Sequence, residues 1–280
     1  MSCRRKFIDK VMIFVPWLCV VVTVIPLISI LGYLIYKGSQ TLNVAFITQL
    51  PKPVGESGGG MANSIMGTGI VVGLAGIFGI PIGVLAGVYL AEFGKHTKLG
   101  WIVRFLADVL QGVPSIVIGI VAYTVVVVPM GNFSAYAGAV ALAMMLIPFL
   151  TRTTEEAILT VPEDIKEAGL ALGQPYWRII LGIVLRSARG PILTGIMLAI
   201  ARIAGETAPL LFTALNNRFW HRGLNGPIST LTVQIYSYAI APFNDWNAQA
   251  WSGALVLILL VTLLNILVRT VARSRYIERS

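Results

Sequence analysis

The chain has 280 residues, of which 56% are apolar and only 12% are charged, and its net charge is +9. A soluble domain usually carries about 25% charged residues, so this chain has too little polar surface to cover a globule in water. The composition excludes an ordinary soluble protein and predicts an all-α integral membrane protein surrounded by lipid.

Six segments are apolar and long enough to cross a bilayer, which takes about 20 residues per helix. The first is too long for the apolar part of a signal peptide, and no cleavage site follows it closely, so we expect an uncleaved span. The expected spans are residues 11–36, 64–91, 101–128, 135–150, 179–211 and 251–268. We expect the chain to be organised as a tail over 1–10, a first span with its external loop over 11–62, a helical core over 63–268 and a tail over 269–280.

The basic residues orient these spans. With the N-terminus in the cytoplasm, most Lys and Arg residues fall on the inside, and the outside segments hold only Lys37, Lys52, Arg218 and Arg222. This positive-inside bias predicts that both termini are cytoplasmic. It also accounts for the net charge without a nucleic-acid partner, since the chain has no basic helix or aromatic-basic surface of the kind that binds one.

The second span is rich in glycine at intervals of four residues, at Gly69 and Gly73 and again at Gly79, Gly83 and Gly87. Small residues at this spacing form a groove on one helix face, where a second helix can approach closely. Glycine is also common in membrane helices in general, so the spacing by itself leaves both explanations open. We favour close packing and therefore expect a helical bundle.

The main inside loop, over residues 152–178, predicts a short surface helix. Thr160 and Glu163 have the spacing of a capping box, and Pro162 suits a first helical turn. Gly173 and Pro175 are expected to end the helix. Its apolar stripe consists of Ile165, Ala168 and Leu172. Such a short amphipathic helix is suited to docking in a groove of another protein.

Arg202 and Glu206 lie inside the fifth expected span, four residues apart, which on a continuous helix places them on one face within pairing distance. A charge at mid-bilayer costs about 2.5–3.5 kcal/mol on insertion scales, so such residues usually face a bundle interior or an aqueous path. The planar guanidinium group suits an oxyanion. Two interpretations stay open: an anion path, or an ion pair that only holds helices together. Arg152, at the inside end of the fourth span, is either part of the same path or an ordinary topology anchor.

Other site chemistries find little support in the sequence. The chain has no clustered nucleophile and base, and no Walker A motif, so we expect no catalytic residue and no ATP hydrolysis by this chain alone. We also expect no metal site and no cofactor in this chain, because its cysteines and histidines are scattered. These residues are Cys3, Cys19, His96 and His221.

The inside loop resembles that of ABC importer permeases, whose motif is Glu-Ala-Ala, then Gly, then Ile-x-Leu-Pro at fixed spacing. The matching positions here are Glu167-Ala168-Gly169, Gly173 and Ile183-Val184-Leu185-Arg186, with Gly169 and Arg186 departing from the motif. The resemblance implies a type I (MetI-like) permease fold with six transmembrane helices and a permease core over 63–268. It also implies that 163–175 is a coupling helix that seats in a cleft of an ATPase. The residues implied in ATPase coupling are Glu163, Glu167, Ala168, Gly169 and Gly173.

Three further stretches resemble Pst-type phosphate permeases, and the A-type subunit more than its C-type partner. They are LQGVPSIV at 110–117, ARIAGETAP at 201–209 and the segment from Thr230 to Ile266. The resemblance implies a phosphate permease of the bacterial inner membrane. Arg202, Glu206 and Arg152 are the candidate substrate-pathway residues.

The implied partners are a second, PstC-like permease, a PstB-like ATPase dimer that binds and hydrolyses ATP, and an external PstS-like phosphate-binding protein. Three alternatives remain: a sulfate or molybdate permease of the same class, an ion-coupled secondary transporter, and a membrane enzyme. A secondary transporter predicts internal repeats and several mid-membrane carboxylates, and the sequence has no convincing repeat.

Overall fold

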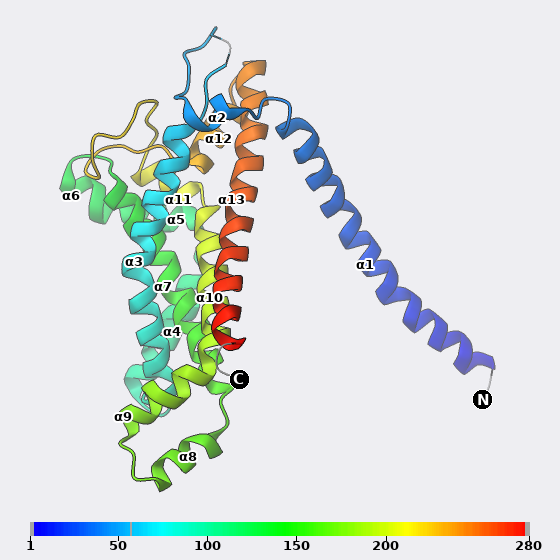
Figure 1. Ribbon diagram of the computed structural model, residues 1–280, viewed down its shortest axis with the longest axis vertical. Helices are drawn as coiled ribbons and strands as arrows, with labels where there is room; N and C mark the ends of the chain where they lie inside the picture. Colours follow the sequence, from blue (N-terminus) through cyan, green and yellow to red (C-terminus); the bar gives the residue numbers. More distant parts are fainter. Residues whose placement is uncertain (1–2, 57, 278–280) are drawn as a thin grey trace.

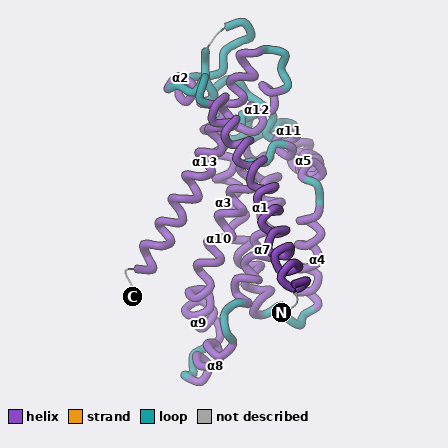
Figure 2. Tube along the Cα trace, turned by 90° about the vertical axis from the view of Figure 1, so that its right-hand side faces the viewer, coloured by secondary structure: helices purple, strands orange, loops and turns teal. Residues whose placement is uncertain are grey.

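The computed structural model describes residues 3–56 and 58–277, and its side chains over 9–56, 58–266 and residue 270. Across these residues all regular structure is helical (Figures 1 and 2). Most of the basic side chains expected to mark the two cytoplasmic ends lie outside the described side chains, namely those of Arg4, Arg5, Lys6, Arg269, Arg273, Arg275 and Arg279.

The elements follow one another along the chain as helices and two π-helical segments. They are α1 (Cys3–Gly38), α2 (Val44–Thr48), α3 (Ala62–Glu92), α4 (Lys98–Gly112), α5 (Ser115–Ala122), η1 (Tyr123–Val127), α6 (Val128–Met130), α7 (Ala135–Leu159), α8 (Glu163–Ala171), α9 (Tyr176–Ile179), η2 (Ile180–Val184), α10 (Leu185–Ala204), α11 (Ala208–Thr213), α12 (Leu231–Ala239) and α13 (Asn244–Ile277). Figure 1 shows α8 at one end of the bundle and α2 and α12 at the other.

Five described helices are long and apolar enough to cross a membrane, and a bent pair makes a sixth span. The six-span architecture expected from the sequence is therefore confirmed. The expected boundaries were less accurate at the ends, because helices continue beyond their apolar windows. Residues 3–10 and 269–277, expected as tails, extend α1 and α13, while residues 278–280 lie outside the described part.

The third expected span is broken, because its halves, α4 and the stretch Ser115–Met130 that begins with α5, meet at an angle of 108°. The break falls at Val113, whose ψ of 130° is extended. Pro114 causes it, since proline has no backbone N–H to donate and its ring disfavours the helical conformation of the preceding residue.

The fifth expected span is also broken. Helix α10 ends at Ala204, and Gly205, Glu206 and Thr207 separate it from α11. The outer pieces of the two broken spans pack against each other: a Cβ placed on Gly119 of α5 would lie 2.8 Å from Pro209 Cα of α11. Both pieces also pack against α7. Interrupted helices at membrane depth occur where protein or an aqueous cavity satisfies the freed backbone groups.

The centre of the bundle is the contact between α3 and α7. A Cβ on Gly83 would lie 2.7 Å from Leu150 Cβ, and one on Gly87 would lie 2.6 Å from the Thr151 carbonyl oxygen. The close approach predicted for this part of the glycine pattern is confirmed, since no larger side chain fits. Gly69 and Gly73 behave differently, because a Cβ on either would meet nothing within 4 Å. They line an open apolar groove instead.

Helix α1 leans away from the bundle, as Figure 1 shows. It touches the bundle near its outer end, where Leu34 is buried and Tyr33 meets Trp251 edge to face at 5.1 Å between ring centroids. The apolar stretch that makes α1 long enough to cross a membrane contains no buried residue, so nearly all of this helix is open to lipid or to another chain.

Candidate functional site

Arg202 and Glu206 do not form the expected helical pair. Helix α10 ends between them, so the four-residue spacing no longer places the two side chains on one face. Among the described residues no ion pair joins them. The Arg202 guanidinium group lies over the Phe149 ring of α7, 5.8 Å from its centroid. The Glu206 carbonyl oxygen accepts a hydrogen bond of 2.9 Å from the Thr232 hydroxyl.

Arg202 lies on an open face of α10. The exposed residues along this helix recur at helical spacing and include Pro191, Thr194, Leu198 and Arg202. A guanidinium group facing lipid is unfavourable, so this face must be covered by protein or water in the membrane. The ring of Phe149 attracts the cation by its quadrupole and leaves the N–H donors at the edge of the fork available. This geometry suits contact with an oxyanion at the break in the span.

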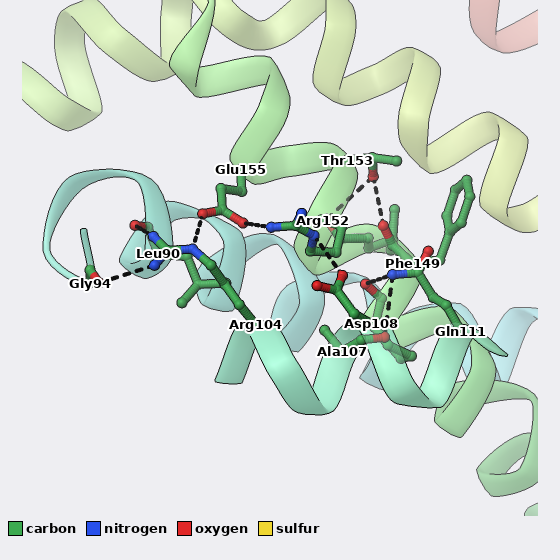
Figure 3. A network of polar contacts seen from close by, with 12 residues as sticks. Leu90, Gly94, Arg104, Ala107, Asp108, Gln111, Phe149, Arg152, Thr153 and Glu155 are labelled. Atoms are coloured by element: carbon green, nitrogen blue, oxygen red, sulfur yellow. Dashed lines mark hydrogen bonds and ion pairs between the residues drawn. The ribbon is translucent and has the colours of Figure 1, made fainter. Parts of the chain in front are cut away.

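A second group of charged side chains joins α4 to α7 (Figure 3). Glu155 is at its centre, with 3% of its side chain exposed, and it accepts from Arg104 Nε at 2.5 Å and from Arg152 Nη1 at 2.6 Å. Arg152 Nε lies 2.9 Å from Asp108 Oδ1. Arg104 also donates to the Leu90 carbonyl oxygen at 2.9 Å, which extends the network to α3. The network holds the inner half of the broken third span against α7.

The environments of Arg152 and Arg202 are therefore different. Arg152 lies between two carboxylates, whereas Arg202 lies against the ring of Phe149 and forms no ion pair among the described residues. The contacts of Arg152 are those of a residue that holds helices together, a role different from the path member or topology anchor that the sequence left open. The sequence reasoning did not find Glu155, although a carboxylate three residues after Arg152 at the end of an apolar run is a usable signal.

Helix α8 forms where the inside loop predicted a helix, but its start differs. Pro162 occupies the N-cap position without a side-chain cap, so the expected capping box is wrong. The Thr160 hydroxyl donates instead to the Ala157 carbonyl oxygen at 2.7 Å, because Thr160 is the C-cap of α7. Gly173 has a φ of +70°, which is the left-handed conformation that ends a helix and favours glycine.

Helix α8 presents two different faces. Lys166 and Gly169 are buried against the rest of the chain, and a Cβ on Gly169 would lie 3.1 Å from Ile179 Cδ1. Glycine at position 169, in place of the second alanine of the permease loop motif, therefore relieves a tight contact with Ile179. The expected apolar stripe faces outward, and the side with Glu167 is exposed as well. The outward residues are Ile165, Glu167, Ala168 and Leu172.

Ionic contacts at α8 connect it to the end of α3. Lys95, in the link after α3, lies 3.1 Å from Glu163 at the first position of α8. The hydrogen bond from Lys95 lowers the pKa of the Glu163 carboxyl group, and the charge of Lys166 lowers this pKa further. Deeper in the contact, Lys166 lies 2.8 Å from Glu92. Within the described residues no group of three metal-ligating side chains is present.

The broken spans, the central α3–α7 contact and the inside helix α8 define a helical membrane permease of the ABC importer class. The fold matches two solved importers. The inward-facing methionine importer MetNI matches with a TM-score of 0.61 and 20% identity, over 76% of this chain and 93% of that one. A bacterial importer of the polysaccharide alginate matches with a TM-score of 0.65, 14% identity and coverage of 95% and 99%.

The family is shown by sequence. Residues 79–275 match the model of the binding-protein-dependent transport system inner membrane component family, and the chain belongs to this family. The phosphate transport system permease protein PstA of Yersinia pestis is 47% identical over 88% of this chain and 83% of its own length. The PstA protein of Haemophilus influenzae is 46% identical over 95% and 94%.

Proposed function

We propose that this chain is the transmembrane permease subunit of an ATP-driven importer of inorganic phosphate and that it forms half of the translocation pathway. Curated relatives at 46–47% identity carry the name of phosphate permeases. The observation that carries the proposal within this chain is Arg202, an exposed cation near a break in a span, which forms no ion pair among the described residues.

In this proposal Arg202 receives the anion. A guanidinium group offers several N–H donors in one plane and can bind two oxygens of a phosphate at once. The Phe149 ring holds the plane of the group, so less side-chain freedom is lost when the anion arrives. Glu206 lies in the same break and contributes a negative charge that keeps an anion from being held too tightly. Arg152, compensated by Asp108 and Glu155, acts by positioning α4 and not by holding phosphate.

The remaining parts of the importer lie on other chains in this proposal. A second permease covers the open face of α10, an external binding protein delivers phosphate, and two ATPase subunits bind and hydrolyse ATP; this chain needs no cofactor of its own. Both termini lie in the cytoplasm, on the side of α8, as the distribution of Lys and Arg favours. The outward stripe of α8 docks in a cleft of the ATPase, which suits an amphipathic helix with exposed Ile165 and Leu172.

Phosphate uptake into proteoliposomes that contain the whole importer tests this function. We expect Arg202→Ala to abolish uptake and Arg202→Lys to retain part of it, because lysine keeps the charge but loses the planar fork. Arg222→Ala, in an external loop, is the matched control and should transport normally. Normal uptake by an assembled Arg202→Ala importer would refute the anion path.

Competition separates the cargo from its close analogues. Unlabelled phosphate should suppress uptake of radiolabelled phosphate, whereas sulfate and molybdate at the same concentration should not. Equal suppression by sulfate would assign the chain to the sulfate branch of the same class. Uptake without ATP and driven by an ion gradient would instead support a secondary transporter.

A further inference from the structure

Glu92 is placed where a carboxylate is unfavourable. It is the last residue of α3, and its side chain is only 1% exposed. The C-terminal end of a helix carries partial negative charge, so a carboxylate there is repelled unless a cation compensates it. Burial raises the cost of an uncompensated charge further. The end of α3 therefore depends on a cationic partner.

Lys166 of α8 is that partner. Its Nζ lies 2.8 Å from Glu92 Oε1, and only 5% of its side chain is exposed. Tyr176, at the start of α9, donates its hydroxyl to the other carboxylate oxygen, Glu92 Oε2, at 2.6 Å. One buried carboxylate thus joins three segments: the end of α3, the helix α8 and the chain that leads into α10.

Gly169 of α8 makes an apolar contact with the chain that leads into α10, unlike the ionic contact of Lys166. Gly169 packs against Ile179 and Ile183, and Ile183 belongs to the π-helical segment η2. A π-helical segment interrupts an α-helix and is often found at functional positions. The packing of Gly169 thus reaches α10 through this interrupted segment, whereas the ion pair joins α8 directly to α3.

From these contacts we infer that Lys166 and Glu92 are positioning residues that transmit movement of α8 to α3, and through the close α3–α7 contact to the transport pathway. The inference rests on the proposed function, because it takes α8 as the helix that the ATPase moves. The exposed Lys95–Glu163 pair beside it has 47% and 60% of its side chains exposed and contributes little to this connection.

The test measures ATP hydrolysed per phosphate imported in proteoliposomes containing the whole importer. Lys166→Met and Glu92→Gln should each raise this ratio at least about fivefold, the low end of the usual coupling between linked sites. The double variant Glu92→Lys with Lys166→Glu restores opposite charges and should bring the ratio back to within about twofold of wild type, which is below that range. Lys98→Met, at an exposed lysine on the same side of the protein, is the matched control.

Co-purification of the ATPase with each variant separates coupling from assembly. An unchanged ratio in an assembled Lys166→Met importer would overturn the inference, and so would a double variant that assembles but stays uncoupled. If the single variants fail to assemble, the double variant is the test. A ratio near the wild-type value supports the inference, and an assembled but uncoupled double variant overturns it. The wild-type importer tests the proposed function independently: if it imports another anion, the same ratio is measured with that anion.

Discussion

Removing the charge of Glu155 is the most informative perturbation of stability in this chain. Glu155→Gln leaves the guanidinium groups of Arg104 and Arg152 facing a neutral amide inside the α4–α7 contact. Breaking a buried ion pair by neutralising one partner typically costs about 3–5 kcal/mol. The two arginines keep 25% and 29% of their side chains exposed, so solvent reduces the penalty. We therefore expect a loss of about 3 kcal/mol in the free energy of unfolding.

Glu156→Gln is the matched control, because Glu156 is the next residue on the same helix and is exposed. Its substitution should change stability by less than about 0.5 kcal/mol, as surface substitutions usually do. Equilibrium unfolding of the purified permease in mixed micelles measures both variants. Equal unfolding free energies for the two would show that Glu155 does not hold α4 against α7.

Two further predictions concern packing and pH. Gly83→Ala should destabilise the protein by about 1–3 kcal/mol through overpacking, since the new Cβ lies 2.7 Å from Leu150 Cβ. Gly73→Ala is the control and should not destabilise it, since nothing lies within 4 Å of a Cβ there. Equal unfolding free energies for the two variants would contradict the α3–α7 contact. Because the folded pKa of Glu163 is lowered from 4.5, its ion pair stabilises the protein above the unfolded pKa and is lost as pH falls through the folded pKa. Lys95→Met should reduce this acid-side loss in a titration of stability, since Lys166 still lowers the pKa of Glu163, and an unchanged profile would refute it.

Some features of the fold follow from local sequence. An apolar run of about 20 residues has few alternatives to a membrane helix, because only a helix satisfies all its own backbone groups in lipid. The break at Pro114 was not predicted, although proline restricts its own residue and the one before it. Gly173, in contrast, marked the end of α8 by the conformation that it alone adopts easily.

The candidate site was less accessible to sequence reasoning. The pairing of Arg202 with Glu206 assumed a continuous helix, and the helix ends between them. The partners found in the structure are far apart in the chain: Glu92 with Lys166, and Arg104 with Glu155. No periodicity within one segment predicts such pairs, because they depend on how separate helices are placed against one another.

The sequence by itself determined that this is a helical membrane protein of up to six spans with a short amphipathic helix between two of them, because hydrophobic length and turn residues act locally. Its resemblance to known proteins, and not these local patterns, indicated a permease. Only the tertiary structure decided which charges are compensated. It placed Arg152 between carboxylates, left Arg202 open on α10, and buried Lys166 against Glu92. The physical reason is that the cost of a charge depends on its surroundings in space, which the order of residues along the chain does not specify.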